Sequence, residues 1–315
     1  MIRGLIMSLL LCASSSLLAA QTGVDWLTRM TDSFDTLSYD GVFVHQEAGM
    51  MNSMRVRRGL IGGVEYESLE DLDGQRIAVI RIDDSVICVF PDVGDYVAGV
   101  TLAEPLRRFQ ELDKDRLTQA YDIKIVDKSQ RIASRKAVKL KLIPKDEYRY
   151  GHEFWIDKST GFLLKHDVLS LDHQLLERIQ FTSVSFAPDL KEADFTPSDD
   201  SYTQHFVEVE PKVVKRNWHF DWLPQGFALV WQEARRMNDS TNMMLLSDGM
   251  STVSVFVEQT DKKRPQTIMN LGATIAGEMS IQVDEQMYLL TMVGEVPAVT
   301  IQRLMAVIMP GPDND

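Results

Sequence analysis

Apolar residues fall at helical spacing near the start of the chain and at every second position through most of the remaining sequence. Over residues 22–38 a single apolar stripe recurs with the period of an α-helix, and Thr22 stands before it as a candidate N-cap. The stripe consists of Trp26, Leu27, Met30, Phe34 and Leu37. This pattern predicts an amphipathic helix with one buried face.

From Tyr39 onward the period changes to two, which is the period of a β-strand with one buried face. The alternating segments are YDGVFVHQ, MRVRRG, VEYESLEDL, RIAVIRI, SVICVFP, DIKIVDK, AVKLKLI, HEFWID, FLLKHDVLSL and LERIQFTSVSF. The Asp73-Gly74 pair between two of them is typical of a hairpin turn. Residues 102–120 interrupt them and predict a second helix. About ten strands joined by short turns predict a strongly curved antiparallel sheet with both helices on its concave side.

The length of the chain and a loss of periodicity after the last of these strands predict two domains. A chain of 315 residues exceeds one typical hydrophobic core. We assign residues 21–186 to a large β domain, 187–217 to an acidic linker, 218–309 to a smaller α+β domain and 310–315 to a disordered tail. The fold class is therefore mainly β (α+β), with few helices.

Residues 1–20 have the pattern of a secretory signal peptide. Arg3 precedes a short apolar run, and Ala19 and Ala20 supply small residues for cleavage. We expect a soluble, exported chain in which Cys88 is the one remaining cysteine, buried and inert, so that no intramolecular disulfide forms. The net charge of −13 argues against a nucleic-acid partner, because phosphates require a basic surface.

Candidate catalytic and metal sites are weaker than their structural alternatives. Ser247 in the Ser-Asp-Gly stretch lacks a G-x-S-x-G elbow, and a hairpin turn explains it better. His166, Asp172 and His173 have no metal-ligand spacing, so we interpret the histidines as solvent-facing strand residues. We predict that the protein is not an enzyme and carries no metal or cofactor.

The remaining candidates are a cavity and a surface. A curved sheet either fills its interior or leaves an apolar hollow that binds acyl chains or amphipathic peptides. The candidate lining is Phe43, Ile80, Val89, Phe154, Leu164 and Phe181, for which plain core is the alternative. Arg55, Arg57 and Arg58 could contact a lipid headgroup or an acidic partner, and a solvated strand face is the alternative.

Several segments, in this order, resemble the RseB/MucB family of periplasmic regulators of the envelope-stress sigma factor sigma-E. In the large domain they are WLTRM, LSYDGVFVHQ, EYESLEDLDGQRIAVIR, CVFP, HEFWID and TGFLLKHDVL. In the small domain they are WLPQGF, LLSDGMSTVSVFVE and VGEVP. The resemblance extends over nearly the whole chain after residue 20, and the order and spacing of the segments make it specific.

The resemblance implies a large domain similar to the unclosed β-barrel of the lipoprotein carriers LolA and LolB. It also implies a periplasmic protein that binds the periplasmic segment of a membrane-anchored anti-sigma factor of the RseA/MucA type and protects it from regulated proteolysis. Lipopolysaccharide or another acyl-chain lipid would release that segment, and a homo-oligomer, dimeric or larger, is expected. A carrier of lipids or lipoproteins is the alternative function. Val253, Val255 and Val257 are the candidate edge strand for the partner.

Overall fold

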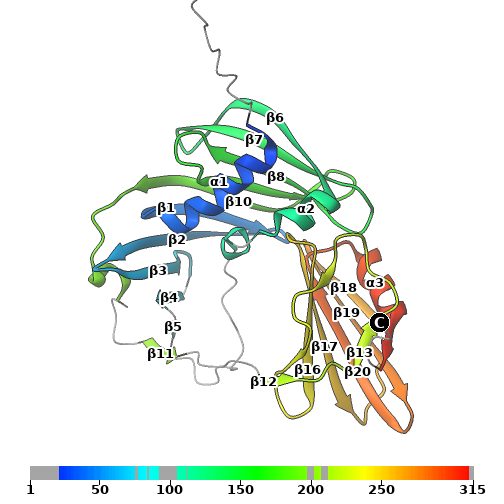
Figure 1. Cartoon of the computed structure of the whole chain (residues 1–315). Helices are drawn as coiled ribbons and strands as arrows, with labels where there is room; N and C mark the ends of the chain where they lie inside the picture. Colours follow the sequence, from blue (N-terminus) through cyan, green and yellow to red (C-terminus); the bar gives the residue numbers. More distant parts are fainter. Residues whose placement is uncertain are drawn as a thin grey trace, which may run out of the picture.

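Two antiparallel β-sheets form the two lobes of the molecule in Figure 1. The computed structural model describes residues 21–311 except 75–76, 84, 92–104, 111, 197–201 and 207–211. The predicted signal peptide and residues 312–315 of the predicted tail lie outside these ranges. Within them the predicted mainly β, two-domain fold is confirmed.

The first helix, α1 (Gly23–Thr36), begins and buries itself as its sequence pattern predicts. The Thr22 hydroxyl accepts the Asp25 N–H, and the Asp25 carboxylate accepts the Thr22 N–H, which completes a capping box. Trp26, Leu27 and Met30 are buried on its inner face. The last turn of α1 contains no basic residue of its own, so Arg58 from the sheet supplies the positive charge at this end of the helix dipole.

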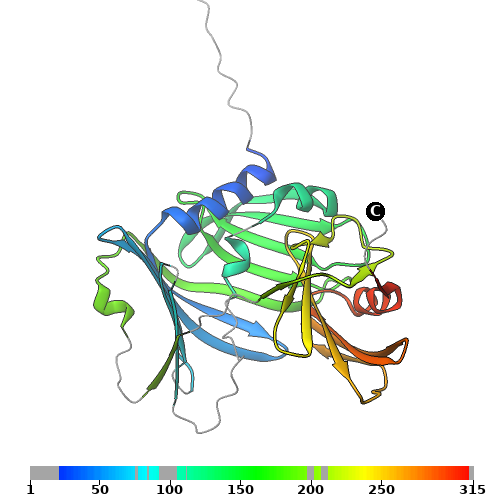
Figure 2. The same cartoon turned by 60° about the horizontal axis from the view of Figure 1, so that its bottom comes forward.

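The large sheet has eleven strands in the order β11-β5-β4-β3-β2-β1-β10-β9-β8-β7-β6. Their bounds are β1 (Tyr39–Glu47), β2 (Met50–Ile61), β3 (Val64–Asp71), β4 (Ala78–Ile82), β5 (Ser85–Pro91), β6 (Tyr121–Ile132), β7 (Arg135–Pro144), β8 (Gly151–Asp157), β9 (Leu163–Leu169), β10 (Leu175–Phe186) and β11 (Tyr202–Phe206). Pairing of β1 with β10 joins two meanders into one curved, open sheet whose edges are β6 and β11 (Figure 2).

The second predicted helix is two shorter helices. A 3₁₀ turn, η1 (Arg107–Phe109), precedes α2 (Lys114–Ala120). Asp113 separates them, because its backbone is extended and its carboxylate accepts the Arg116 N–H as a helix N-cap. Both pieces contribute to the same buried cluster as α1, which places all three on one face of the sheet (Figure 2).

The segment assigned as a linker, residues 187–217, contributes regular structure to both lobes. The 3₁₀ turn η2 (Glu192–Phe195) packs against β3, and β11 pairs with β5 in the large sheet. Further along, β12 (Lys212–Val214) pairs with β15 in the small sheet. The chain therefore crosses between the lobes after β11 and before β12.

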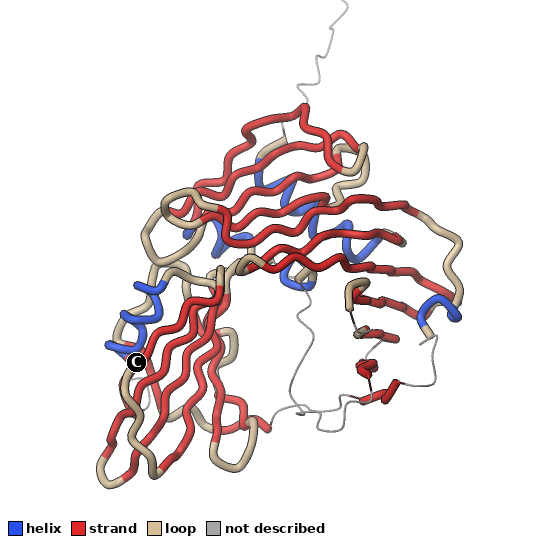
Figure 3. The backbone as a smooth tube through the Cα atoms, turned by 180° about the vertical axis from the view of Figure 1, so that it is seen from behind, coloured by secondary structure: helices blue, strands red, loops and turns tan. Residues whose placement is uncertain are grey.

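The small domain has an eight-stranded antiparallel sheet with one helix against it (Figure 3). Its strands are β12, β14 (Ala228–Leu229), β15 (Ala234–Arg236), β16 (Thr241–Ser247), β17 (Thr252–Thr260), β18 (Thr267–Leu271), β19 (Thr274–Val283) and β20 (Gln286–Gly294). The predicted closing helix is α3 (Ala298–Val307), which packs on β18, β19 and β20. A separate pair, β13 (Trp218–Phe220) and β21 (Ile308–Pro310), brings the end of the chain back to the start of the domain.

Candidate functional site

The predicted lining of the apolar hollow divides into two groups. Phe43, Phe154, Leu164 and Phe181 all belong to the main core of the large domain, and each is 0–1% exposed. The rings of Phe43 and Phe181 are tilted to each other, with 5.3 Å between centroids, and α1 and η1 contribute to the same cluster. The four side chains therefore belong to the buried core beneath the helices.

Ile80 and Val89 lie in a different cluster, with Tyr66 and Phe195. The ring of Phe195 from η2 packs on Tyr66 at 5.3 Å. These residues belong to strands on the β11 side of the sheet, away from β8 and β9. The alternation of apolar residues indicates only that a position is buried, not which other buried positions lie next to it. The six predicted lining residues are therefore all buried but lie in two different parts of the sheet. As a lipid or peptide site they stay a prediction.

The three arginines of β2 are engaged within the protein. Arg55 forms two hydrogen bonds with the carboxylate of Asp40, at 2.9 and 2.6 Å. Arg57 donates to the Asp194 carbonyl of η2 at 3.1 Å. Arg58 donates to the carbonyls of Asp35, in the last turn of α1, and of Leu37, just after it, and is only 7% exposed. Their roles in contacting a headgroup or a partner stay predictions.

The expectation that Val253, Val255 and Val257 offer an edge strand is wrong. They lie in β17, which pairs with β16 on one side and β20 on the other, and their side chains are buried in the core of the small domain. The hydrogen-bonding groups of the strand are occupied on both sides, so it cannot accept another strand. The edges of this sheet are β12 and β18.

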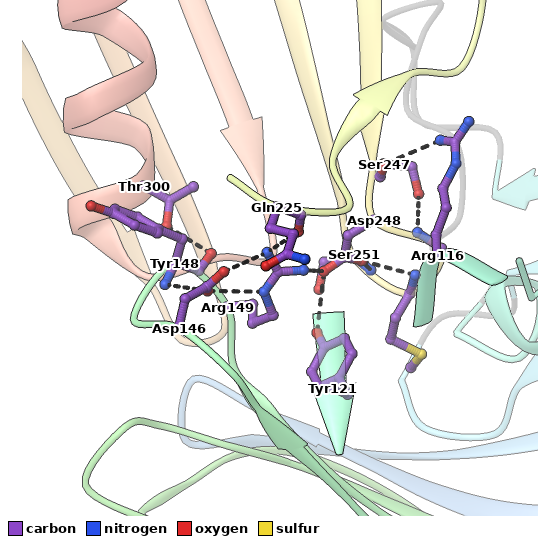
Figure 4. A network of polar contacts seen from close by, with 12 residues as sticks. Arg116, Tyr121, Asp146, Tyr148, Arg149, Gln225, Ser247, Asp248, Ser251 and Thr300 are labelled. Atoms are coloured by element: carbon purple, nitrogen blue, oxygen red, sulfur yellow. Dashed lines mark hydrogen bonds and ion pairs between the residues drawn. The ribbon is translucent and has the colours of Figure 1, made fainter. Parts of the chain in front are cut away.

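The Ser-Asp-Gly turn between β16 and β17 docks the small domain onto the large one (Figure 4). The Ser247 hydroxyl accepts the Gly249 N–H, and the Ser247 carbonyl accepts a hydrogen bond from Arg116 of α2. Gly249 has φ +92°, and a Cβ at this position would lie 2.6 Å from the Asp113 carbonyl oxygen. Glycine is thus required both by the turn and by the close approach of the domains.

A buried ion pair forms the centre of this contact. Asp248 and Arg149, from different domains, are both fully buried and lie 2.8 Å apart. Arg149 also donates to Asp146 at 3.0 and 2.8 Å and to the Gln225 carbonyl at 2.6 Å. Burial raises the pKa of Asp248, and Arg149 opposes that shift. The many hydrogen bonds offset the cost of removing two charges from water.

A chain of polar groups continues from this pair into the large domain. The Tyr121 hydroxyl donates to Asp248 at 3.3 Å and lies 3.5 Å from Nε2 of His152. His152 Nδ1 in turn lies 3.1 Å from His166 Nε2. Both rings are buried, so the expectation that His166 faces solvent is wrong. Burial, reinforced by Arg108, lowers the pKa of His152 to about 3. The same causes lower the pKa of His166, so both rings are neutral at pH 7.

A second contact joins the large domain to α3. The Thr300 hydroxyl donates to the Tyr148 carbonyl at 2.8 Å. Arg303 lies over the Trp222 ring, 3.8 Å from its centroid, and also contacts Tyr148. Tyr148 meets Trp222 edge to face at 4.8 Å. This cluster fixes the helix of the small domain beside the β7–β8 loop.

A third contact surrounds a cavity of about 220 Å³ between the domains. Arg108 of η1 forms ion pairs with Glu177 of β10 and with Glu295 of the small domain. His45 Nε2 lies 3.0 Å from Glu177 Oε1. Burial disfavours the charged form of Glu177, but Arg108 and His45 hold the pKa of this carboxyl well below its usual value. The remaining lining residues are Glu47, Pro105, Met250 and Thr252.

The small sheet has one face, with both apolar and polar side chains, that no helix of the described residues covers (Figure 1). Pairing aligns Leu245, Ser254, Val293, Ala276 and Met269 across five strands, with Met243 and Phe256 in the next row. These side chains alternate with those that pack against α3. Leu245, Phe256 and Val293 are half-buried, and Met269 is exposed.

A further hollow, of about 520 Å³, opens at the ends of β7, β8 and β9. Its apolar part includes Leu142, Ile143 and Leu171, and Lys141 and Lys145 lie at the same site. Asp146, which holds Arg149, also lines it. The hollow therefore adjoins the ion pair that joins the domains.

The interdomain residues are the ones that the sequence pattern did not single out as a site. Arg149 and Asp248 are separated by almost a hundred positions, and nothing near Arg149 distinguishes it from a solvated charge. The sequence feature that points to this contact is the glycine of the Ser-Asp-Gly turn. Gly249 has a positive φ, and a glycine in a buried turn often lies where another part of the backbone comes close.

A curved sheet with a buried core and a second sheet docked on it by ion pairs define a two-domain, mainly β protein. The chain belongs to the MucB/RseB family: residues 22–199 match the MucB/RseB N-terminal domain and residues 212–309 match the MucB/RseB C-terminal domain. The resemblance of the sequence segments to the RseB/MucB family is thus confirmed.

Individual relatives are regulatory proteins. The sigma factor AlgU regulatory protein MucB of Pseudomonas aeruginosa is 32% identical over 295 residues, which cover 91% of this chain and 90% of that protein. The structure of the Pseudomonas aeruginosa MucA/MucB complex matches 92% of this chain and 99% of that chain, at 30% identity and a TM-score of 0.75. A crystal structure of MucB matches 91% of this chain and 98% of that chain, at 27% identity and a TM-score of 0.63. No helix within the described ranges is long and apolar enough to span a membrane.

Proposed function

We propose that this protein is a periplasmic negative regulator of a sigma-E type factor. It binds the periplasmic segment of a membrane-anchored anti-sigma factor and protects that segment from regulated proteolysis. The observation that carries the proposal is the family match over both domains, together with the MucA/MucB complex among the solved relatives. That the relatives are regulatory proteins argues for binding as the function of this chain.

The arrangement of the domains supports a binding-competent state. The chain has a TM-score of 0.75 to the structure of the MucA/MucB complex and a TM-score of 0.63 to another crystal structure of MucB. A partner that binds one domain arrangement more tightly shifts the population toward it by the difference in affinity. We therefore take the docked arrangement, with Arg149 on Asp248, as the one that the anti-sigma factor selects.

The uncovered face of the small sheet is the best candidate for the contact with the partner. Five strands at about 4.8 Å spacing, and residues rising about 3.3 Å each, give an area on the order of 400 Å². A stable interface buries about 800 Å² on each partner. The face thus suits a short amphipathic segment better than a second globular domain, and other contacts must supply the rest.

The hollow beside Asp146 is our candidate for the lipid that releases the partner. Its apolar walls suit an acyl chain. Lys141 and Lys145, which pair with Glu153 and Asp122, are the candidate contacts for a headgroup. A lipid that moves the loop after β7 would disturb Asp146 and, through it, Arg149. The lipid would then favour a state in which the domains separate and the partner is released.

A binding and protection assay tests the proposal. The chain from residue 21 onward is titrated with the periplasmic segment of the anti-sigma factor from the same cell, and cleavage of that segment is followed with and without the chain. We expect binding, slower cleavage, and loss of both on addition of lipopolysaccharide. An anti-sigma segment that neither binds nor gains protection would contradict the proposal, and capture of lipoproteins instead would favour the carrier function.

Oligomerisation is a separate part of the proposal. We expect the free chain to form a homo-oligomer, as the family resemblance implies. Light scattering of the purified chain at increasing concentration measures its mass, and a monomer at all concentrations would remove this part without affecting the binding function.

A further inference from the structure

We propose that the cavity between the domains binds an alkylammonium or guanidinium group, carried by a lysine or arginine side chain of a bound polypeptide. The identity of that polypeptide rests on the proposed function, whereas the chemistry of the site rests on the cavity alone. The cavity lies where η1, β1 and β10 of the large domain meet the start of β17 and the end of β20.

The charges around the cavity do not balance. Glu47, Glu177 and Glu295 contribute three negative charges, and Arg108 contributes one positive charge, so the cluster has a net charge of −2 when His45 is neutral. Burial and then the charge of Glu177 raise the pKa of Glu47, and burial also raises the pKa of Glu295. The carboxylates are therefore destabilised by one another in a partly dry space. A bound cation would remove that repulsion.

Unused hydrogen-bonding capacity points to the same ligand. Glu177 is 3% exposed, and its Oε2 atom is buried with no hydrogen-bond partner, whereas its Oε1 atom receives Arg108 and lies beside His45. A buried carboxylate oxygen without a donor is costly, since the group has lost its water. An N–H donor from a ligand in the cavity would satisfy it. Both terminal nitrogens of Arg108 are already engaged by carboxylates. Its Nε atom is also buried without a hydrogen-bond partner, but the net negative charge of the cluster disfavours an anion.

The size and donor geometry favour an organic cation. A cavity of about 220 Å³ corresponds to roughly seven waters at about 30 Å³ each, which is enough for the end of a lysine or arginine side chain. No group of three or more histidine, cysteine, aspartate or glutamate side chains in the described parts of the chain is arranged to hold a metal ion. Several carboxylates spread around a larger space instead match the multiple N–H groups of a guanidinium or ammonium.

The cavity lies at the end of the uncovered face of the small sheet. A polypeptide bound to that face could therefore supply the cationic side chain. Thr252 points to the same side of β17 as Phe256, and Glu295 directly follows Gly294, the last residue of β20. Glu47 accepts a hydrogen bond from Thr274, which belongs to that side of β19. A polypeptide lying on the uncovered face could therefore place one cationic side chain in the cavity, where it would contact both domains at once.

Small probes test the site without any partner. Propylguanidinium and butylammonium are titrated into the chain from residue 21 onward, and the midpoint of thermal unfolding is measured at constant ionic strength. Their neutral counterparts, propylurea and butanol, serve as controls. A ligand that binds only the folded state stabilises it in proportion to its occupancy. We expect the two cations to raise the midpoint saturably and the neutral analogues to leave it unchanged.

Two glutamate variants locate the effect. Glu47→Gln removes one charge from the cavity while keeping a side chain that can bond Thr274, and we expect about tenfold weaker binding of propylguanidinium, the change that about 1.4 kcal/mol produces. Glu278→Gln removes the same charge from the middle of the uncovered face, where it pairs with Arg264, and should leave binding unchanged. Equal responses to cations and neutral analogues, or equal losses in both variants, would overturn the proposal. Binding of the probes without any anti-sigma binding would keep this site and reject only the polypeptide as its source.

Discussion

Asp248 combines two tasks that are usually separate. Its Oδ1 accepts the N–H groups of Met250 and Ser251 and so shapes the turn. Its Oδ2 receives Arg149 and Tyr121 from the large domain. One carboxylate therefore shapes the turn and also holds the neighbouring domain. At this scale the chain looks like an ordinary hairpin but functions as an interdomain joint.

A single methyl group should loosen that joint. In Gly249→Ala the new Cβ would meet the Asp113 carbonyl at 2.6 Å, and the residue would keep a φ of +92°. We expect a loss of about 3 kcal/mol in the free energy of unfolding, from strain and the lost approach together. Gly63→Ala is the matched control, because Gly63 has a φ of +89° with nothing within 4 Å, and strain of about 1 kcal/mol is its only penalty. Equal losses for the two variants in urea unfolding would contradict the interdomain role of Gly249.

The buried histidine pair should make stability depend on pH. The folded-state pKa of His152 is lowered to about 3, whereas in the unfolded chain it is about 6.5, so only the unfolded state gains a proton between these values. The stability contributed by the neutral ring is therefore complete above about pH 6.5 and is lost as the pH falls toward 3, by about 1.4 kcal/mol per pH unit. His166 acts in the same direction.

The carboxylates titrate in both the unaltered protein and the His152→Gln variant. The difference in pH dependence between the two proteins therefore reports the contribution of His152 alone. Urea unfolding of each protein at pH 7, 6 and 5 gives two slopes. We expect the variant to lose stability less steeply, by about 1.4 kcal/mol per pH unit below pH 6.5. Parallel slopes would mean that His152 takes up its proton in the folded state without difficulty. The groups that face the pair, Arg108, Glu177 and Tyr121, are unchanged in this comparison.

At the scale of elements, the sequence predicts where helices and strands lie, because those signals are local. It does not predict which strands pair with one another. The start of α1 was predictable because Thr22 and Asp25 form its capping box within four residues. The strands were predictable because burial alternates along them. The position of β17 was not, because its partner β20 is a distant segment and an alternating pattern is the same for an edge and a central strand. For the same reason the six predicted lining residues were found to be buried but could not be assigned to one cavity.

The uncovered face of the small sheet should carry the affinity for the anti-sigma segment. Phe256 lies in the middle of this face, between Met243 and Thr291 on the neighbouring strands. Truncating a central aromatic residue of an interface commonly costs about 2 kcal/mol or more, so Phe256→Ser should weaken binding about 30-fold. Leu60→Ser is the control, since Leu60 is 65% exposed on β2 in the large domain. A binding titration in which both variants match the unaltered chain would place the partner elsewhere.

At the scale of the molecule, three contacts determine the angle between the domains. They are the Arg149–Asp248 pair, the cluster of Tyr148 with Arg303, and the bridge from Arg108 to Glu295. Each joins the large domain to a different part of the small one. Two of the three depend on buried charges, which are stable only while their partners stay in place. A ligand or partner that alters one pair therefore acts on the whole arrangement, which is how binding on one domain could change the other.

Removing the charge of Asp248 tests this dependence. In Asp248→Asn the amide oxygen can still accept the N–H groups of Met250 and Ser251, so the turn is kept while Arg149 loses one of its two carboxylates. Breaking a buried pair on one side costs about 3 kcal/mol, and we expect the domains to separate in part of the population. Small-angle scattering should show a larger radius of gyration, and amide exchange in residues 247–251 should accelerate. Asp284→Asn at the exposed β19–β20 turn is the control. If the scattering and the exchange both match the unaltered protein, the ion pair does not hold the domains together. If the domains separate but the anti-sigma segment still binds with full affinity, the docked arrangement is not the one that the partner selects.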